Sequence, residues 1–271
     1  MSSTKVLITV KTYPTLSGKY EELVCTAGFR EDGSLIRIFP IPFRKKSYAE
    51  QYRKYDWIEL DLVKNESDFR PESYRPHSLE SEIKIVGHIK PRGNWAERKK
   101  LTLNKVYQNL SELIAEAKNK EICTSLAVFK PSKITRFKIE EVERDWDKGK
   151  LAKLLQLNLF EVRSEGKLEV VKKLPYKFSY TILDNQGQES TMMIEDWEIG
   201  QLYWNCLARH EGNESKAVDD VENKYFNEFT KTKDLYLFLG TTQLHHFVSM
   251  NPFIIIGTFH PKIESQGSLF D

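Results

Sequence analysis

The sequence predicts an α+β fold, in which a small β-barrel-like sheet at the N-terminus precedes a mixed unit with a largely antiparallel sheet. Three observations support this prediction. Up to about residue 90 the chain consists of short apolar runs separated by turn residues, which is typical of strands. Three later segments repeat apolar residues at helical spacing, and two strongly apolar runs lie near the C-terminus. We therefore expect a β-barrel-like domain over 1–95, an α+β domain over 96–262 and a flexible tail over 263–271.

Five strands are expected in the N-terminal domain. Gly33 follows Glu31 and Asp32 in a hairpin turn, because glycine adopts a positive φ without steric cost. Pro40 and Pro42 end the third strand, since proline cannot donate to a strand ladder. Five short strands within this length favour a strongly curved sheet or a barrel. The expected strands cover residues 5–11, 20–30, 35–41, 56–63 and 82–89.

The α+β domain is expected to begin with a helix over 103–117, where apolar residues recur at three- and four-residue spacing and Asn104 is the expected cap. Gly187 closes a second hairpin turn that starts at Asp184. The other elements expected before residue 195 are strands near 124–129 and 134–142, a helix over 147–157, and strands over 177–183 and 189–194.

The last elements are two helices and two buried strands. Asp196 and Asn213 are placed as N-caps of helices that carry apolar residues on one face. Both helices should pack on the final sheet. The runs 235–239 and 253–257 are so apolar that both faces of that sheet are expected to be covered.

The net charge of the chain is only +2 because the charges of a basic part and an acidic part nearly cancel. The 271 residues include 41 Lys+Arg and 39 Asp+Glu, and 40% are hydrophobic, which excludes a disordered or collagen-like chain. Residues 1–180 hold 35 basic and 25 acidic side chains, whereas residues 181–271 hold 6 and 14. Such a division indicates a nucleic-acid or other anionic partner for the basic part.

The chain shows no sign of a membrane partner or of secretion. No stretch approaches the roughly 18 apolar residues of a membrane span, and the start does not resemble a signal peptide. Cys25, Cys123 and Cys206 are far apart and lie in apolar contexts, so we expect reduced core thiols. A zinc site would show paired cysteine spacing, so no metal is expected, and the sequence indicates no particular cofactor. These features predict a cytoplasmic protein.

Lysines and arginines are interleaved with aromatic residues in four segments of the basic part. This mixture suits DNA or RNA, because cations meet phosphates and aromatic rings stack on bases. The alternative is that the segments are solvated faces with their aromatic residues turned into the core. Binding requires the segments to converge on one face. The predicted nucleic-acid-binding residues are Lys11, Tyr13, Arg44, Lys45, Lys46, Arg53, Arg70, Arg75, Arg92, Trp95, Arg98, Lys99 and Lys100.

Two strand ends are expected to line one rim of the barrel. The segments 11–14 and 39–44 each end a strand with aromatic residues and proline. Rims of this type contact the ligand in oligonucleotide-binding barrels and in small hooded β-barrels that read modified bases. The alternative is that the aromatic residues only close the end of the barrel.

A second hypothesis is an enzyme acting on nucleic acid or a nucleotide, such as a phosphodiesterase or nuclease. Asp196 and Glu198 follow a strand at a helix start, where carboxylates bind metals or act as general bases. His245 and His246 follow the end of a buried strand, a position typical of binding and catalysis. In the alternative interpretation, Asp196 caps the helix and Glu198 complements its dipole. A third hypothesis is an interaction protein whose acidic C-terminal part binds a basic partner.

The final residues resemble the peptide by which bacterial DNA-processing proteins bind the replication sliding clamp. Gln266, Leu269 and Phe270 match that peptide, whereas Gly267 stands where leucine is commoner. The resemblance implies that Leu269 and Phe270 enter an apolar pocket while Gln266 forms a hydrogen bond at its rim. The alternative is a tail that folds back and buries its two apolar residues. The sequence as a whole favours a nucleic-acid-binding protein of bacterial DNA or RNA metabolism.

Overall fold

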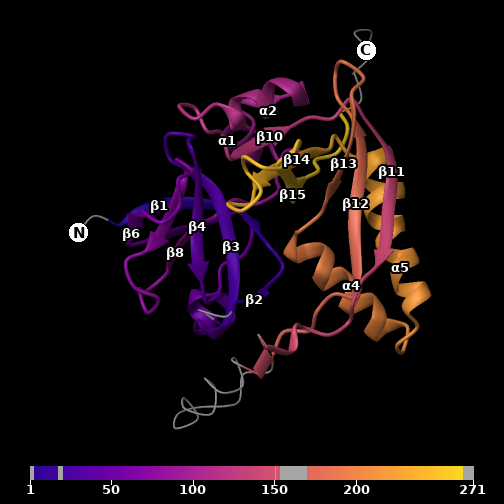
Figure 1. Cartoon of the computed structure of the whole chain (residues 1–271), viewed down its shortest axis with the longest axis horizontal. Helices are drawn as coiled ribbons and strands as arrows, with labels where there is room; N and C mark the ends of the chain where they lie inside the picture. The colour runs from indigo at the N-terminus through magenta and orange to yellow at the C-terminus, as the bar shows by residue number, and fades with distance from the viewer. Residues whose placement is uncertain (1–2, 18–20, 150, 153–169, 265–271) are drawn as a thin grey trace.

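A computed structural model describes residues 3–17, 21–149, 151–152 and 170–264 and has the expected α+β fold (Figure 1). The N-terminal part is a curled sheet in the order β6-β7-β4-β3-β1-β5-β8, with β2 paired to β3. In the described residues its end strands β6 and β8 do not pair, so the sheet is a half-barrel. Its strands are β1 (Thr4–Lys11), β2 (Thr15–Ser17), β3 (Glu21–Arg30), β4 (Leu35–Ile41), β5 (Asp56–Leu60), β6 (Leu62–Lys64), β7 (Ser73–Pro76) and β8 (Lys84–His88); the short helical turns η1 (Phe43–Lys45) and η2 (Tyr48–Glu50) follow β4.

The half-barrel is buried on both of its faces. Ile8 of β1 belongs to an apolar cluster made almost wholly of half-barrel residues. Its neighbour Leu7 belongs to another cluster that also holds Phe238 and Phe259 of the C-terminal part. Successive side chains of a strand point to opposite faces. The second face of the half-barrel is therefore covered by the C-terminal part, and the two parts share this core.

The C-terminal part has two sheets where we expected one. One sheet has the order β15-β14-β10-β9, and the other is antiparallel with the order β11-β12-β13. Leu237 packs in the core of the C-terminal part while Phe238 faces the half-barrel, so the prediction of burial on both faces is confirmed. The strands are β9 (Val106–Tyr107), β10 (Leu126–Phe129), β11 (Lys133–Glu141), β12 (Tyr176–Leu183), β13 (Glu189–Met193), β14 (Tyr236–Thr241) and β15 (Phe253–Phe259).

The helices α4 (Trp197–Arg209) and α5 (Glu214–Glu222) pack on the three-stranded sheet (Figure 1). Asp196 caps α4 and Asn213 caps α5, as predicted, each with a side-chain oxygen that accepts from a backbone N–H at 3.1 Å. The chain continues through a π-helical turn, η3 (Asn223–Glu228), into α6 (Phe229–Thr232). In the part of the chain described here, no helix is long and apolar enough to cross a membrane.

The prediction of one helix over 103–117 is wrong for its N-terminal residues. The chain instead forms α1 (Ala96–Thr102), then β9, and then α2 (Leu110–Lys118). The reason is tertiary: β9 pairs in parallel with β10, and this pairing removes residues 106–107 from the helix. The cap is Asn109, whose side chain accepts from the Glu112 N–H at 3.1 Å, and not Asn104. The helix expected over 147–157 lies mostly outside the described residues.

Gly28 of β3 lies directly against the backbone of the neighbouring strand β1. A Cβ at this position would lie 1.9 Å from the Leu7 carbonyl oxygen and 3.2 Å from the Ile8 Cα. These are backbone atoms of a buried strand, so no side-chain rotation relieves the overlap. We expect Gly28→Ala to lower the free energy of unfolding by about 1–3 kcal/mol, measured by urea denaturation.

Gly87→Ala is the matched control, because a Cβ at Gly87 of β8 would meet no atom closer than 3.8 Å. Its free energy of unfolding should stay within about 0.5 kcal/mol of the wild type. An equal loss in the two variants would show that strand glycines in general, and not the β1 contact, set the cost.

Candidate functional site

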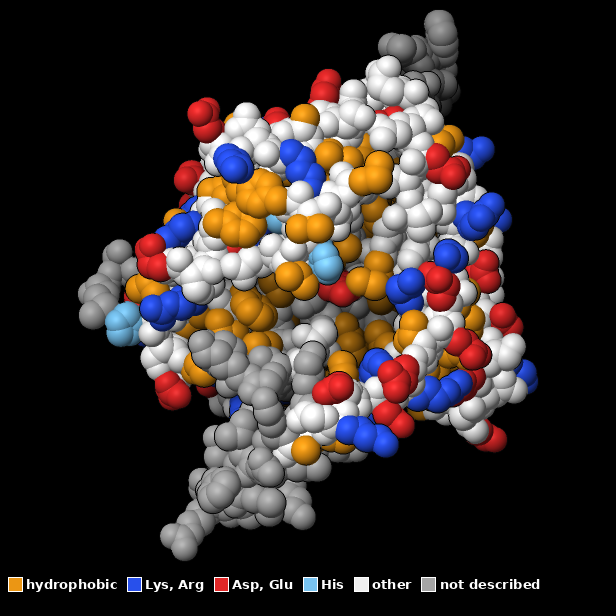
Figure 2. All heavy atoms as spheres, in the orientation of Figure 1, with side chains coloured by type: hydrophobic (Ala, Val, Ile, Leu, Met, Phe, Trp, Pro, Cys, Tyr) orange, Lys and Arg blue, Asp and Glu red, His pale blue; other side chains and the backbone are white. Residues whose placement is uncertain are grey.

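A cavity of about 580 Å³ lies between the half-barrel and the C-terminal part. Figure 2 shows a hollow between the two parts on the face viewed, with hydrophobic side chains in it and charged side chains around it. The wall from the half-barrel consists of Thr12, Thr15, Leu23, Cys25, Arg37, Phe39, Pro40, Asn65, Glu66, Ser67, Asp68, Arg70 and Arg75. The wall from the C-terminal part consists of Glu195, Thr241, Thr242, Gln243, Ile254 and Ile256.

Both segments expected at the barrel rim reach this cavity. Thr12 follows β1, and Phe39 and Pro40 lie near the end of β4; both strands pair with β3, which brings the two segments to the same wall. Tyr13 does not line the cavity. Its hydroxyl donates to the Lys172 carbonyl at 2.7 Å and accepts from the Trp204 indole at 2.8 Å, so it ties the half-barrel to α4.

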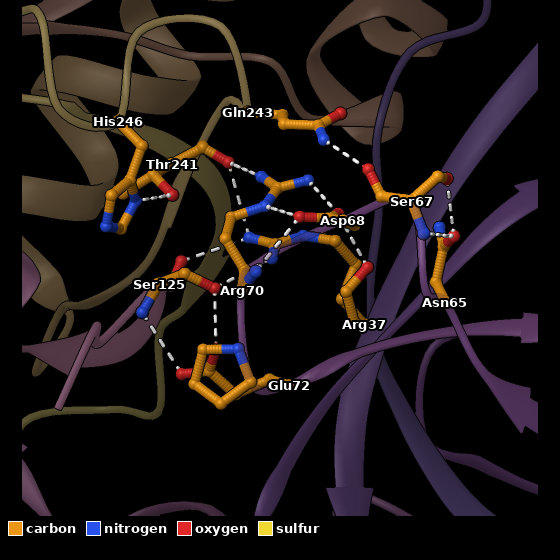
Figure 3. A network of polar contacts seen from close by, with 12 residues as sticks. Arg37, Asn65, Ser67, Asp68, Arg70, Glu72, Ser125, Thr241, Gln243 and His246 are labelled. Carbon is orange, nitrogen blue, oxygen red and sulfur yellow. Dashed lines mark hydrogen bonds and ion pairs between the residues drawn. The ribbon is translucent and has the colours of Figure 1, made fainter. Parts of the chain in front are cut away.

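Arg70 and Asp68 form a buried ion pair in the loop between β6 and β7 (Figure 3). The Arg70 guanidinium donates to both carboxylate oxygens, at 2.8 and 2.6 Å, and also to the Thr241 carbonyl. Ser73 adds a hydrogen bond to Asp68 at 2.7 Å. Burial opposes ionisation of Asp68, but the hydrogen bonds from Arg70 and Ser73 outweigh it and lower its pKa to about 2. The ion pair therefore fixes the loop to the end of β14.

Arg37 makes a second contact between the parts. Its guanidinium donates to the Ser125 hydroxyl at 2.8 Å and to the carbonyls of Ser125 and Thr241 at 3.0 and 3.3 Å (Figure 3). The Ser125 hydroxyl in turn donates to Glu72 at 2.7 Å. Burial and the neighbouring Arg70 lower the pKa of Arg37. Both buried arginines are thus occupied by protein groups and act as structural clamps.

Two polar groups of the cavity wall lack a protein partner among the described residues. The Glu195 carboxylate has no hydrogen bond or ion pair there, and burial raises its pKa. The Thr242 hydroxyl oxygen is buried and has no hydrogen-bond partner. Leaving a buried polar group such as the Thr242 hydroxyl unpaired costs about 1–3 kcal/mol, so this hydroxyl, with the half-buried Glu195 carboxylate on the same wall, indicates a ligand that would complete it. Burial also raises the pKa of the Cys25 thiol on the same wall, which keeps it protonated at neutral pH.

A second charged cluster lies at the start of α4. Lys54 Nζ donates to Asp196 at 2.9 Å and to Glu198 at 2.7 Å. Burial lowers the pKa of Lys54, but the two carboxylates outweigh burial and raise it. Lys11 Nζ lies 4.1 Å from the Phe43 ring centre and 5.0 Å from that of Trp197, and burial lowers its pKa to about 8. Asp196 is therefore used as both a helix cap and an ion-pair partner.

The structure places His245 and His246 away from this cluster. His246 is buried and bonds through Nδ1 to the Thr241 hydroxyl and through Nε2 to the Ala117 carbonyl, both at 2.7 Å. Burial lowers its pKa, and His245 beside it is exposed. Among the described residues no hydrogen bond joins His245 or His246 to Asp196 or Glu198. A catalytic role for these four residues stays a prediction.

The other residues predicted to bind nucleic acid differ in how far they are buried and in what they contact. Arg98 is buried, donates to the Ile89 carbonyl at 2.9 and 2.7 Å and packs on Tyr55, while Trp95 packs on Phe259. Lys46 donates to the Ser81 carbonyl, Lys99 pairs with Glu264, and Arg44 and Lys45 lie on η1. The exposed members are Lys45, Arg53, Arg75, Arg92 and Lys100. Gln266, Leu269 and Phe270 lie outside the described residues.

Sequence reasoning missed most of the cavity wall. Glu195 was visible only as part of an acidic run, and Asp68 carries no motif. The best available signal was the proline-containing loop around Arg70, since polar loops often carry function. Thr241 and Thr242 meet that loop only through the tertiary fold, so spacing along the chain does not reveal them.

The fold and the cavity define a two-part α+β protein with a space of ligand size where its parts meet. The chain belongs to the family described as "Domain of unknown function (DUF8757)", whose model matches residues 106–271. The model described as "Domain of unknown function (DUF8758)" matches residues 2–104. No curated protein matches the chain. A solved mouse structure described as "Structure of murine DNA binding protein bound with ds DNA" is similar at 13% identity, with 100% of both chains covered and a TM-score of 0.33.

Proposed function

We propose that this chain binds nucleic acid and accepts one unpaired nucleotide into the cavity between its two parts. The observation that carries the proposal is the pair of unpartnered polar groups, Glu195 and Thr242, on the wall of a cavity of about 580 Å³. Ligand pockets typically measure about 300–1,000 Å³. Proteins that take a base out of its stack read its edge with polar groups and contact its faces with aromatic or apolar side chains. Phe39 and Ile254 are available for such contacts.

The phosphate backbone would be met by exposed cations and not by the buried arginines. Arg37 donates to a hydroxyl and two carbonyls of the protein, and Arg70 donates to the Asp68 carboxylate and to a carbonyl. Arg75 is exposed and lines the cavity, so it is the cation best placed for a phosphate beside the bound nucleotide. Neutralising phosphates releases counterions, which makes the affinity fall with added salt.

Binding of labelled single-stranded DNA and RNA, followed by fluorescence anisotropy between about 50 and 200 mM salt, tests this proposal. Glu195→Ala should weaken binding by about 10- to 100-fold with an unchanged salt slope, because it removes hydrogen bonds to a base and no phosphate contact. Arg75→Gln should instead reduce the salt slope by about one.

Lys216→Gln is the matched control for charge, because Lys216 is exposed on the acidic helix α5 and does not line the cavity. Wild-type affinity is expected for this variant. An absence of binding at low salt, or equal affinities for the wild type and Glu195→Ala, would overturn the proposal.

We further propose that the C-terminal peptide binds a sliding clamp, on the basis of its resemblance at Gln266, Leu269 and Phe270. Short extended peptides of this type bind through a few apolar anchors in a pocket. Deleting residues 265–271 should abolish binding to a purified bacterial clamp in surface plasmon resonance and leave oligonucleotide affinity unchanged. Unchanged clamp binding after the deletion, or none by the full chain, would rule this partner out.

A further inference from the structure

Five large apolar side chains stand exposed on two neighbouring loops, and we call this group the apolar knuckle. Leu244, Phe247, Val248 and Met250 lie between β14 and β15, with 76, 41, 82 and 95% of their surface exposed. Phe69, from the loop between β6 and β7, is 48% exposed, and its ring stacks on Phe247 with 5.0 Å between centroids. Soluble proteins seldom expose contiguous apolar surface of this kind unless it contacts a partner.

Buried contacts hold the knuckle outward. His246 bonds to the Thr241 hydroxyl and to the Ala117 carbonyl, both at 2.7 Å. Lys118 Nζ donates to the carbonyls of His246 and Ser249 at 2.8 and 2.5 Å. Four hydrogen bonds thus fix the loop to the end of α2 and to β14. Its apolar side chains are presented on an anchored loop and do not fold back onto the core.

The knuckle lies at the mouth of the cavity. Ser67 and Gln243 line the cavity and are exposed, which places them at its opening. Each belongs to one of the two knuckle loops, and Gln243 Nε2 donates to the Ser67 carbonyl at 2.7 Å. A partner that contacts the knuckle therefore also lies across the cavity entrance.

The loop between β14 and β15 has no acidic side chain, whereas Glu66 of the loop between β6 and β7 is exposed at the cavity wall. Residues 181–271 contain 14 acidic side chains, yet residues 235–263 contain none. No carboxylate of the loop between β14 and β15 would repel phosphates that approach the cavity. A lipid bilayer would contact the apolar side chains but would not supply a ligand for the polar wall behind them.

We infer that the apolar knuckle inserts into the base stack and fills the gap left there by the nucleotide that enters the cavity. This inference rests on the proposed function and assigns its partner as a duplex or hairpin with a weakened base pair. Proteins that open a base step commonly insert Phe, Leu or Met as a wedge, and these residue types are present here. A mismatched pair lowers the cost of unstacking, so such a site is preferred.

The test uses the full chain and a DNA duplex with 2-aminopurine at a central mismatch, because the fluorescence of this base rises when it leaves the stack. The wild type should raise the fluorescence. The double variant Leu244→Ser and Val248→Ser should abolish the rise and weaken binding about tenfold, with an unchanged salt slope. Both side chains are largely exposed, so the variant should unfold at the wild-type temperature. The control is Val86→Ser, which removes a 46% exposed apolar side chain from β8.

The outcomes separate the inference from the proposed function. If the double variant raises the fluorescence and binds as the wild type does, the knuckle is no wedge, although nucleic-acid binding stands. If the wild type binds no oligonucleotide, the proposed function fails and the inference fails with it. If the double variant loses only binding to phosphatidylcholine–phosphatidylglycerol vesicles, or only self-association in sedimentation, the knuckle serves a membrane or a second copy and the inference is overturned.

Discussion

Replacing Lys54 with methionine should lower the free energy of unfolding by about 3–5 kcal/mol, because two carboxylates then lose the buried cation between them. Lys54 Nζ lies 2.9 Å from Asp196 and 2.7 Å from Glu198, with only 7% of its side chain exposed. The Asp196 side chain is fully buried and also caps α4. The variant should therefore weaken both the contact between the two parts and the first turn of the helix. Urea denaturation at neutral pH measures the loss.

The dependence of this loss on pH gives a second check. Burial raises the pKa of Asp196, and Lys54 opposes that rise, so removing Lys54 raises the pKa further. An acid with a raised pKa in the folded state destabilises that state as the pH rises above its unfolded value. The loss should thus be smaller near pH 4 than near pH 7.

Lys5→Met is the control for the Lys54 variant, since the Lys5–Glu31 pair is exposed at 36 and 64% of its side chains. Its cost should not exceed about 1 kcal/mol. A Lys54 variant as stable as this control, or a loss independent of pH, would contradict a buried charge cluster at the start of α4.

Several signals that act within a few residues were read correctly from the sequence, although the cap expected at Asn104 was not. Gly33 and Gly187 have φ values of 81° and 80° in the two expected hairpin turns. Asp196 and Asn213 cap the two expected helices. Each of these features depends on residues at most four positions away, so the local sequence contains the information needed.

Features decided by distant partners were not predictable in this way. The strand expected over 56–63 is divided into β5 and β6, because β5 pairs with β1 whereas β6 pairs with β7. The helix expected from residue 103 gives way to β9 because β10 is available for pairing. Local propensity favoured a helix there, and tertiary pairing outweighed it.

The cavity shows the same limit at the level of single side chains. The sequence favoured Arg70 as a phosphate ligand, because guanidinium groups suit phosphates. The structure buries Arg70 against Asp68 and against the carbonyl of Thr241, which is 171 positions away. Arg98 is likewise buried. Composition cannot distinguish a buried, paired arginine from an exposed one, so basic residues in a sequence overestimate the surface that can bind phosphates.

Asp68→Asn should lower the free energy of unfolding by about 3–5 kcal/mol, because it leaves the buried Arg70 guanidinium without a carboxylate. Arg70 then no longer holds the loop between β6 and β7 against the Thr241 carbonyl. The same variant should weaken oligonucleotide binding, since this loop carries cavity residues and Phe69 of the knuckle. Urea denaturation and fluorescence anisotropy measure the two effects. Glu121→Gln, an exposed acidic-to-amide change at a residue that does not line the cavity, is the control.

The dependence of stability on pH identifies the Asp68 carboxylate as the cause. Its pKa is lowered from 3.8 to about 2, so its stabilising effect is complete above the unfolded value and is lost as the pH falls toward 2. The wild type should lose about 2–3 kcal/mol from this group over that interval, a loss that Asp68→Asn cannot show. The two stability curves should therefore converge in acid. Parallel curves would mean that another acid is responsible, and that the ion pair does not hold the wall of the cavity.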